Sequence, residues 1–163
     1  MKTHYFIFIL FFCFWVNGQE TFTPLKTENS QIVLDGKLTE GEWDNAAQIP
    51  LDIEFSPANN LPARKETIGY ITYSDRYLYI AVYAKDDPNN IRASMRQRDD
   101  SNIWNDDVFL VRLDTYTDAR NNLGLAVNAF GSQFDVRQVN SLTDEGRYDS
   151  SFNVNFESVG TIV

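Results

Sequence analysis

One loop concentrates the residue types that could do chemistry. Residues 96–107 hold two arginines, four aspartates, three amides and Trp104, directly before an expected strand. A sugar site needs this mix, because a flat ring takes the C–H face of a sugar while amides, carboxylates and guanidinium groups take its hydroxyls. The aspartates could instead bind calcium, although their spacing is not that of an EF-hand. The remaining interpretation is a solvated, salt-bridged loop with Trp104 packed in the core.

A second candidate is an aromatic strand face. In residues 77–84 the tyrosines point to one side of the expected strand and Leu78, Ile80 and Val82 point to the other. Tyr79 lies in the middle of this tyrosine face. The face could line a concave binding surface, or a loop could cover it.

Three further acids raise the question of catalysis. Asp114, Asp118 and Asp135 could supply a pair of carboxyl groups for glycoside hydrolysis. Nothing in the sequence marks any of them as buried with a raised pKa, which a general acid needs. We therefore expect a binding protein rather than an enzyme.

Short strands must position these residues. The β-branched, aromatic and alternating segments predict strands at residues 52–55, 67–73, 77–84, 108–114, 123–130, 133–138 and 152–156. One short helix is expected over residues 39–47, because Thr39 can cap it and Glu42 can reach back, as in a capping box. This pattern predicts an all-β fold, an antiparallel β-sandwich of the jelly-roll or immunoglobulin-like kind.

The amino-terminal residues predict export. Residues 5–16 are almost wholly apolar, yet the run is too short for a permanent membrane helix, and the small residues up to Gly18 suit a signal peptidase. We therefore expect a signal peptide over residues 1–18, a linker over residues 19–31 and a single domain over residues 32–163. The alternative is an uncleaved anchor. The expected location is the periplasm, the outer membrane or the extracellular space.

Cleavage after Gly18 would also restrict the chemistry. It removes His4 and Cys13, the only histidine and the only cysteine. The mature chain would then have no thiolate nucleophile, no disulfide, no histidine base and no zinc site built from these residues. The net charge of −9 argues against nucleic acid and suits neutral sugars or cations held by oxygen ligands.

Several motifs together resemble the family 9 carbohydrate-binding modules over about residues 31–157. The opening resemblance lies in Ile32, Val33, Leu34, Asp35, Gly36, Leu38, Glu40, Glu42, Trp43 and Ala46. Further on it lies in Leu78, Tyr79 and Ile80, in the acidic loop that leads from Arg98 into residues 108–114, and in Asn128, Gly131 and Asp135. The likeness is greatest to modules at the amino end of larger exported bacterial proteins.

The resemblance implies a non-catalytic β-sandwich that binds a poly- or oligosaccharide by aromatic stacking. Such modules bind calcium in some members and are often linked to glycoside hydrolases, which implies a role in polysaccharide breakdown. The residues carried over as the sugar site are Trp104 for stacking, Arg96, Arg98 and Asn128 for hydroxyls, and Tyr79 as a possible second ring. Asp99, Asp106 and Asp107 are carried over as ligands for sugar or calcium.

The carboxyl end departs from this family. Related modules usually continue past residues 152–156 into a final strand with Trp and Glu, whereas this sequence stops at Val163. We therefore expect a truncated domain, with the outer-membrane region of a longer parent protein as a possible partner. The main alternative function is a structural or docking domain of an outer-membrane-associated protein, without a sugar site.

Overall fold

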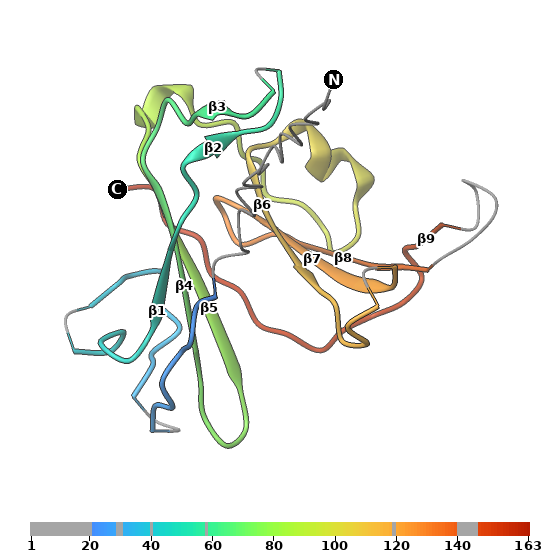
Figure 1. The fold of residues 1–163 in the computed structure, drawn as a ribbon. Coiled ribbons are helices and arrows are strands. Elements are labelled where there is room, and N and C mark those ends of the chain that lie inside the picture. Colours follow the sequence, from blue (N-terminus) through green and yellow to red (C-terminus); the bar gives the residue numbers. More distant parts are fainter. Residues whose placement is uncertain (1–20, 29–30, 40, 58, 119, 140–146) are drawn as a thin grey trace, which may run out of the picture.

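The structure is a computed structural model, and it describes residues 21–28, 31–39, 41–57, 59–118, 120–139 and 147–163. The predicted signal peptide lies outside these ranges. The described chain is all-β with antiparallel sheets, and its only helices are the 3-10 helices η1 (Pro88–Asn90) and η2 (Ser101–Asn105). Figure 1 shows this arrangement. Within these ranges, no helix has the length and apolar character needed to cross a membrane.

A three-stranded sheet has the order β1-β4-β5 and a separate two-stranded hairpin lies beside it. The sheet is built from β1 (Ala47–Pro50), β4 (Thr67–Tyr73) and β5 (Leu78–Ala84), and the hairpin from β2 (Ile53–Glu54) and β3 (Leu61–Pro62). The β4–β5 hairpin agrees closely with the predicted strands, because both segments are rich in aromatic and β-branched residues. The strands β1 and β3 were not predicted.

A second sheet has the order β6-β7-β8-β9. Its strands are β6 (Val108–Leu113), β7 (Asn122–Asn128), β8 (Gln133–Gln138) and β9 (Tyr148–Asp149). On one face the register pairs Phe109 with Val127 and Val111 with Leu125, which confirms the predicted apolar alternation. The opposite face carries the site described below.

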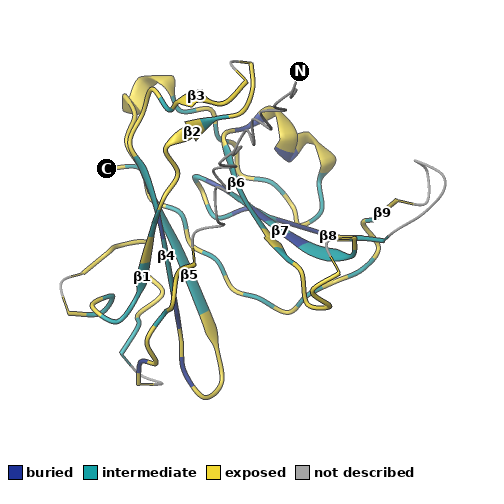
Figure 2. Ribbon diagram, in the orientation of Figure 1, coloured by how far each residue is buried: buried dark blue, intermediate teal, exposed yellow. Residues whose placement is uncertain are grey.

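The buried core lies on that opposite face. Among the described residues the buried hydrophobic side chains are Ile103, Ala126, Phe134 and Val136, with Val108 and Leu110 packed against them. Figure 2 shows that most of the remaining ribbon is half-buried or exposed. The rigid part of the molecule is therefore centred on β6, β7, β8 and η2.

The helix predicted over residues 39–47 is wrong. The segment makes two separate turns, in which Glu42 N–H donates to the Thr39 carbonyl at 3.2 Å and Ala46 N–H donates to the Trp43 carbonyl at 2.9 Å. Gly41 has a φ of +87°, which a helix cannot continue through. Ala47, the last residue of the expected helix, belongs instead to β1 and pairs with Ile71 in β4.

The strand predicted over residues 152–156 is also wrong. This segment is extended but has no strand partner. Side chains on β8 hold it instead, since the Asp135 carboxylate accepts from Val154 N–H and Gln133 Nε2 donates to the Phe156 carbonyl at 3.1 Å. Alternating Phe and Val residues therefore indicated an extended chain correctly but not how that chain is held.

The terminal segment runs past β8 after leaving β9. In Figure 1 residues 150–163 leave β9 and cross to the side of β4 and β5. Face-to-face packing of the two sheets, as a full sandwich requires, stays a prediction.

Candidate functional site

A groove lies on the face of the β6–β9 sheet that carries Leu110, Phe134 and Val136. Its volume is about 370 Å³, and it is lined by Trp104, Leu110, Arg112, Phe134, Val136, Tyr148 and Ser150. These residues come from η2, from three strands of one sheet and from the residue that follows β9. The rings of Trp104 and Tyr148, one guanidinium and the hydroxyls of Tyr148 and Ser150 therefore surround an apolar floor.

The groove floor depends on a glycine. Gly124 lies opposite Arg112 in β6 and opposite Val136 in β8. A Cβ atom at this position would be 2.9 Å from Val136 Cγ1 and 3.5 Å from Leu110 Cδ1. Because Gly124 has no side chain, Leu110 and Val136 can close over β7 and form the floor.

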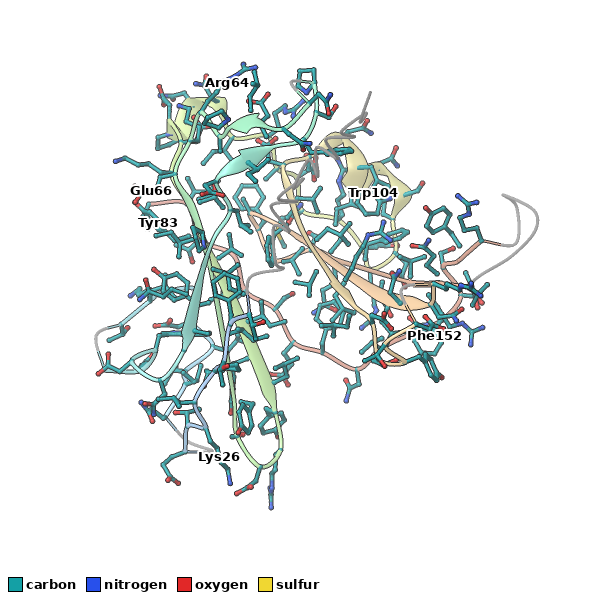
Figure 3. All side chains as sticks on the ribbon, viewed as in Figure 1. Lys26, Arg64, Glu66, Tyr83, Trp104 and Phe152 are labelled. Atoms are coloured by element: carbon teal, nitrogen blue, oxygen red, sulfur yellow. The ribbon has the colours of Figure 1, made fainter. Side chains whose placement is uncertain are left out.

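Trp104 is presented by η2. The Asp100 side chain caps this helix by accepting from Asn102 N–H at 2.9 Å. Ile103 is buried, whereas the neighbouring Trp104 remains 48% exposed. Its ring meets Phe134 edge to face, with centroids 5.2 Å apart and planes at 68°. Figure 3 shows Trp104 projecting from η2 beside the sheet. The ring is thus fixed at its edge while much of its surface is open.

Arg112 and Tyr148 form the opposite rim. Arg112 Nη1 donates to Gln138 Oε1 at 2.6 Å and to Asn122 Oδ1 at 3.3 Å. Tyr148 pairs with Gln138 in the register between β8 and β9, and its side chain is 52% exposed. The strand register therefore brings a second open ring next to a cation that two neutral amides hold in place.

A polar network behind the groove fixes the loop that carries η2. Arg96 forms a bidentate pair with Asp106, with distances of 2.8 and 2.7 Å. Asn128 Nδ2 donates to the same carboxylate at 2.9 Å, and Ser94 N–H donates to it at 3.2 Å. The hydrogen bond from Arg96 holds the pKa of Asp106 well below its ordinary value. Arg96 and Asn128 therefore both bind Asp106.

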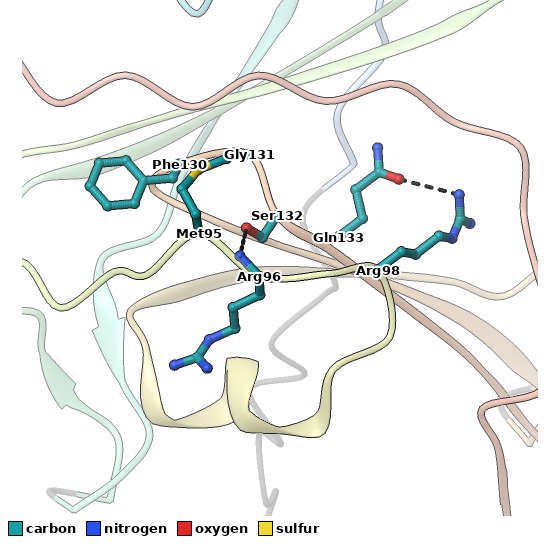
Figure 4. A pocket seen from close by; sticks show the side chains of 7 residues that line it. All are labelled: Met95, Arg96, Arg98, Phe130, Gly131, Ser132 and Gln133. Carbon is teal, nitrogen blue, oxygen red and sulfur yellow. Dashed lines mark hydrogen bonds between the residues drawn. The ribbon is translucent and has the colours of Figure 1, made fainter.

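A smaller cavity lies beside this network. Its volume is about 220 Å³, and its lining consists of Met95, Arg96, Arg98, Phe130, Gly131, Ser132 and Gln133. Figure 4 shows the Arg96 and Arg98 side chains pointing in different directions. Arg98 donates to Asp135 at 2.8 Å and to Gln133 at 3.2 Å. Neither arginine lines the groove that contains Trp104.

The three aspartates predicted as calcium ligands have other partners. Asp99 accepts from Asp135 N–H at 3.2 Å, and Asp107 accepts from the Arg92 backbone and guanidinium at 2.8 and 2.9 Å. Asp106 is occupied by the network above. In the part of the chain that is described, no group of three potential metal ligands is brought together. Calcium binding by these aspartates stays a prediction.

Tyr79 lies on β5, in the other sheet. Its ring contacts Tyr77, with centroids 6.0 Å apart. The register of β4 with β5 places Tyr79 opposite Thr72. The structure therefore does not bring Tyr79 to Trp104, and the second ring of the groove is Tyr148.

The acids considered for hydrolysis are engaged in structural contacts. Asp114 and Asp118 accept from backbone N–H groups of their own loop, and the bond from Asn121 N–H lowers the pKa of Asp118. Asp135 is fully buried against Arg98. Among the described carboxyl groups whose pKa shifts, every shift is downward: Asp86, Asp100, Asp106, Asp118 and Asp149. A general acid at neutral pH needs the opposite shift.

Sequence reasoning missed Arg112, Tyr148 and Ser150. The signal for Arg112 was a single cation inside an otherwise apolar strand, on the face opposite Phe109 and Val111. Tyr148 carried no comparable signal, because its place beside the groove depends on the pairing of a two-residue strand.

No protein-family model, no curated protein and no solved structure matches this chain. The groove geometry and the chemistry of its residues are therefore the basis for assigning a function.

Proposed function

We propose that this chain is a non-catalytic carbohydrate-binding domain of an exported protein, and that its sugar lies in the groove between Trp104 and Tyr148. The observation that carries the proposal is the half-exposed Trp104 ring, fixed against Phe134 at the edge of a groove of about 370 Å³. A fixed aromatic ring stacks on the C–H face of a pyranose without losing much rotamer entropy.

The polar rim supports the same ligand class. Arg112 and the Ser150 and Tyr148 hydroxyls offer donors and acceptors beside an apolar floor. Sites for small molecules combine a mostly apolar lining with a few such polar groups. Family 9 modules, which the sequence resembles, are non-catalytic sugar binders, and this agrees with the proposal.

The experiment is a binding screen of the full chain against arrayed neutral and acidic oligosaccharides, followed by titration calorimetry of the positives. Trp104→Ala should weaken binding about tenfold or more, because stacked aromatic anchors dominate such interfaces. Trp104→Phe, which keeps an aromatic ring, should lose less affinity for the sugar. Tyr116→Ala is the matched control, because Tyr116 is exposed in the β6–β7 loop and does not line the groove. Absence of binding across the array would overturn the proposal.

The second candidate is a docking domain, and one specific observation favours it. Leu51, Ile53 and Phe55, at alternate positions in and beside β2, are between 41% and 77% exposed. Exposed apolar clusters of this kind mark interaction surfaces. A docking domain would bind no sugar and would self-associate, and an Ile53→Ser, Phe55→Ser double variant would abolish that association in sedimentation velocity.

A further inference from the structure

We infer that the sugar bound in this groove carries a carboxylate, as a uronic acid does, and that Arg112 receives it. This inference rests on the proposed function and narrows it from carbohydrate in general to acidic carbohydrate. The observation behind it is a difference between Arg112 and four arginines near the β6–β9 sheet, which are Arg92, Arg96, Arg98 and Arg137.

Each of these four arginines forms an ion pair with an aspartate. The distances between guanidinium and carboxylate are 2.9 Å for Arg92 with Asp107, 2.7 Å for Arg96 with Asp106, 2.8 Å for Arg98 with Asp135, and 2.8 Å for Arg137 with Asp149. In an acidic chain this pairing is expected, because carboxylates outnumber the cations. An aspartate of the chain therefore already balances the charge of each of those four guanidinium groups.

Arg112 differs from these four arginines. Within the described chain no carboxylate forms an ion pair with it, and its contacts are with the neutral oxygens of Asn122 and Gln138. Both contacts use Nη1, so the Nε and Nη2 hydrogens remain available on the side chain's exposed end. That pair of donors is the edge of the guanidinium that binds a carboxylate through two parallel hydrogen bonds.

The surroundings of Arg112 favour an anion attached to a sugar over a free anion. The guanidinium shares its groove with Trp104, Tyr148 and the apolar floor. A pyranose stacked on an aromatic ring directs its equatorial substituents outward, parallel to the ring plane. The carboxylate of a uronic acid is such a substituent, so stacking and ion pairing can act on one residue of the sugar chain at the same time.

The net charge of −9 does not prevent this pairing. At physiological salt, charges more than about 8 Å apart are largely screened, so the local cation outweighs distant acids. Raising the sodium chloride concentration from 50 to 500 mM should consequently weaken binding of the acidic sugar more than that of a neutral one.

The test compares ligands that differ only in charge. The full chain is titrated with tetramers of galacturonic acid and of mannuronic acid, each alongside its carboxyl-reduced neutral counterpart, and with dextran sulfate. We expect at least one acid to bind about tenfold or more tightly than its neutral counterpart, since a hydrogen bond to a charged group contributes more than a neutral one. Arg112→Gln should remove most of this preference. Arg112→Lys should keep part of it, because lysine keeps the positive charge but cannot form the two parallel hydrogen bonds of a guanidinium group.

Controls separate the possible failures. Arg76→Gln removes the same charge from the β4–β5 turn, outside the groove, and should leave the acid preference unchanged. Equal binding of the acidic and neutral tetramers would overturn the inference and leave the proposed function standing. Binding of dextran sulfate without either uronate would assign a sulfate and overturn the carboxylate. Absence of binding to any saccharide would overturn both proposals, and thermal melting checks that each variant is folded.

Discussion

At the scale of single residues, Asp106 is the carboxylate near the groove that accepts the most hydrogen bonds. It accepts from Arg96, from Asn128 and from the Ser94 backbone, and it is 8% exposed. These contacts keep its pKa below the ordinary value of 3.8 in the folded chain. Through Asp106, Arg96 and Asn128 hold the loop that carries Trp104, and their predicted contact with sugar stays a prediction.

The lowered pKa of Asp106 predicts acid lability. A group whose folded pKa lies below its unfolded pKa stabilises the fold above the unfolded value, and this stabilisation is lost as the pH falls through the folded pKa. The loss should therefore begin near pH 4. The free energy of unfolding, measured with urea, should fall less between pH 7 and pH 3 in Asp106→Asn than in the wild type. The reason is that the variant lacks the ionised carboxylate whose stabilising effect is lost in acid. Equal losses in the two proteins would contradict this role.

At the scale of elements, β7 shapes the groove through its glycine. Gly124→Val should destabilise the fold by about 1–3 kcal/mol, because added methyl groups overpack a site that is already in contact. The reason is the 2.9 Å approach of any Cβ atom to Val136. Urea denaturation measures the loss, and Gly69→Val in β4 is the comparison, since a Cβ there meets nothing closer than 3.7 Å. A more stable Gly124→Val variant would show that the floor is loosely packed.

Some of the elements could be predicted from the sequence, and others could not. Residues 67–73 and 77–84 were predicted almost to the residue because their side chains alternate between two faces and favour strands locally. The segment 39–47 was misread because a capping pattern is local, whereas Gly41 and the pairing of β1 with β4 decide its structure. Trp104 was found because a lone loop tryptophan is conspicuous. Its neighbours Arg112 and Tyr148 were not, because only the register of β6 to β9 brings them together.

At the scale of the whole molecule, Arg98 and Asp135 join segments far apart in the chain. Arg98 donates to the buried Asp135 carboxylate and to the Val154 carbonyl, and its guanidinium lies 5.3 Å from the centroid of the Phe156 ring. Asp135 in turn accepts from Val154 N–H. The loop before β6, the strand β8 and the terminal segment therefore meet at one ion pair.

This junction predicts a large difference between two arginine variants. Arg98→Gln leaves the fully buried Asp135 carboxylate without its cation, and this should cost at most about 3–5 kcal/mol, the cost of breaking a fully buried pair, because the Arg98 side chain is 35% exposed. Hydrogen exchange should accelerate in residues 150–160, because these residues are held through side chains and not through a strand ladder. Arg137→Gln is the matched control, because its pair with Asp149 has side chains 48% and 32% exposed and such surface pairs contribute about 1 kcal/mol or less. If both variants lost similar stability and residues 150–160 stayed protected, the ion pair would not be what holds the terminal segment.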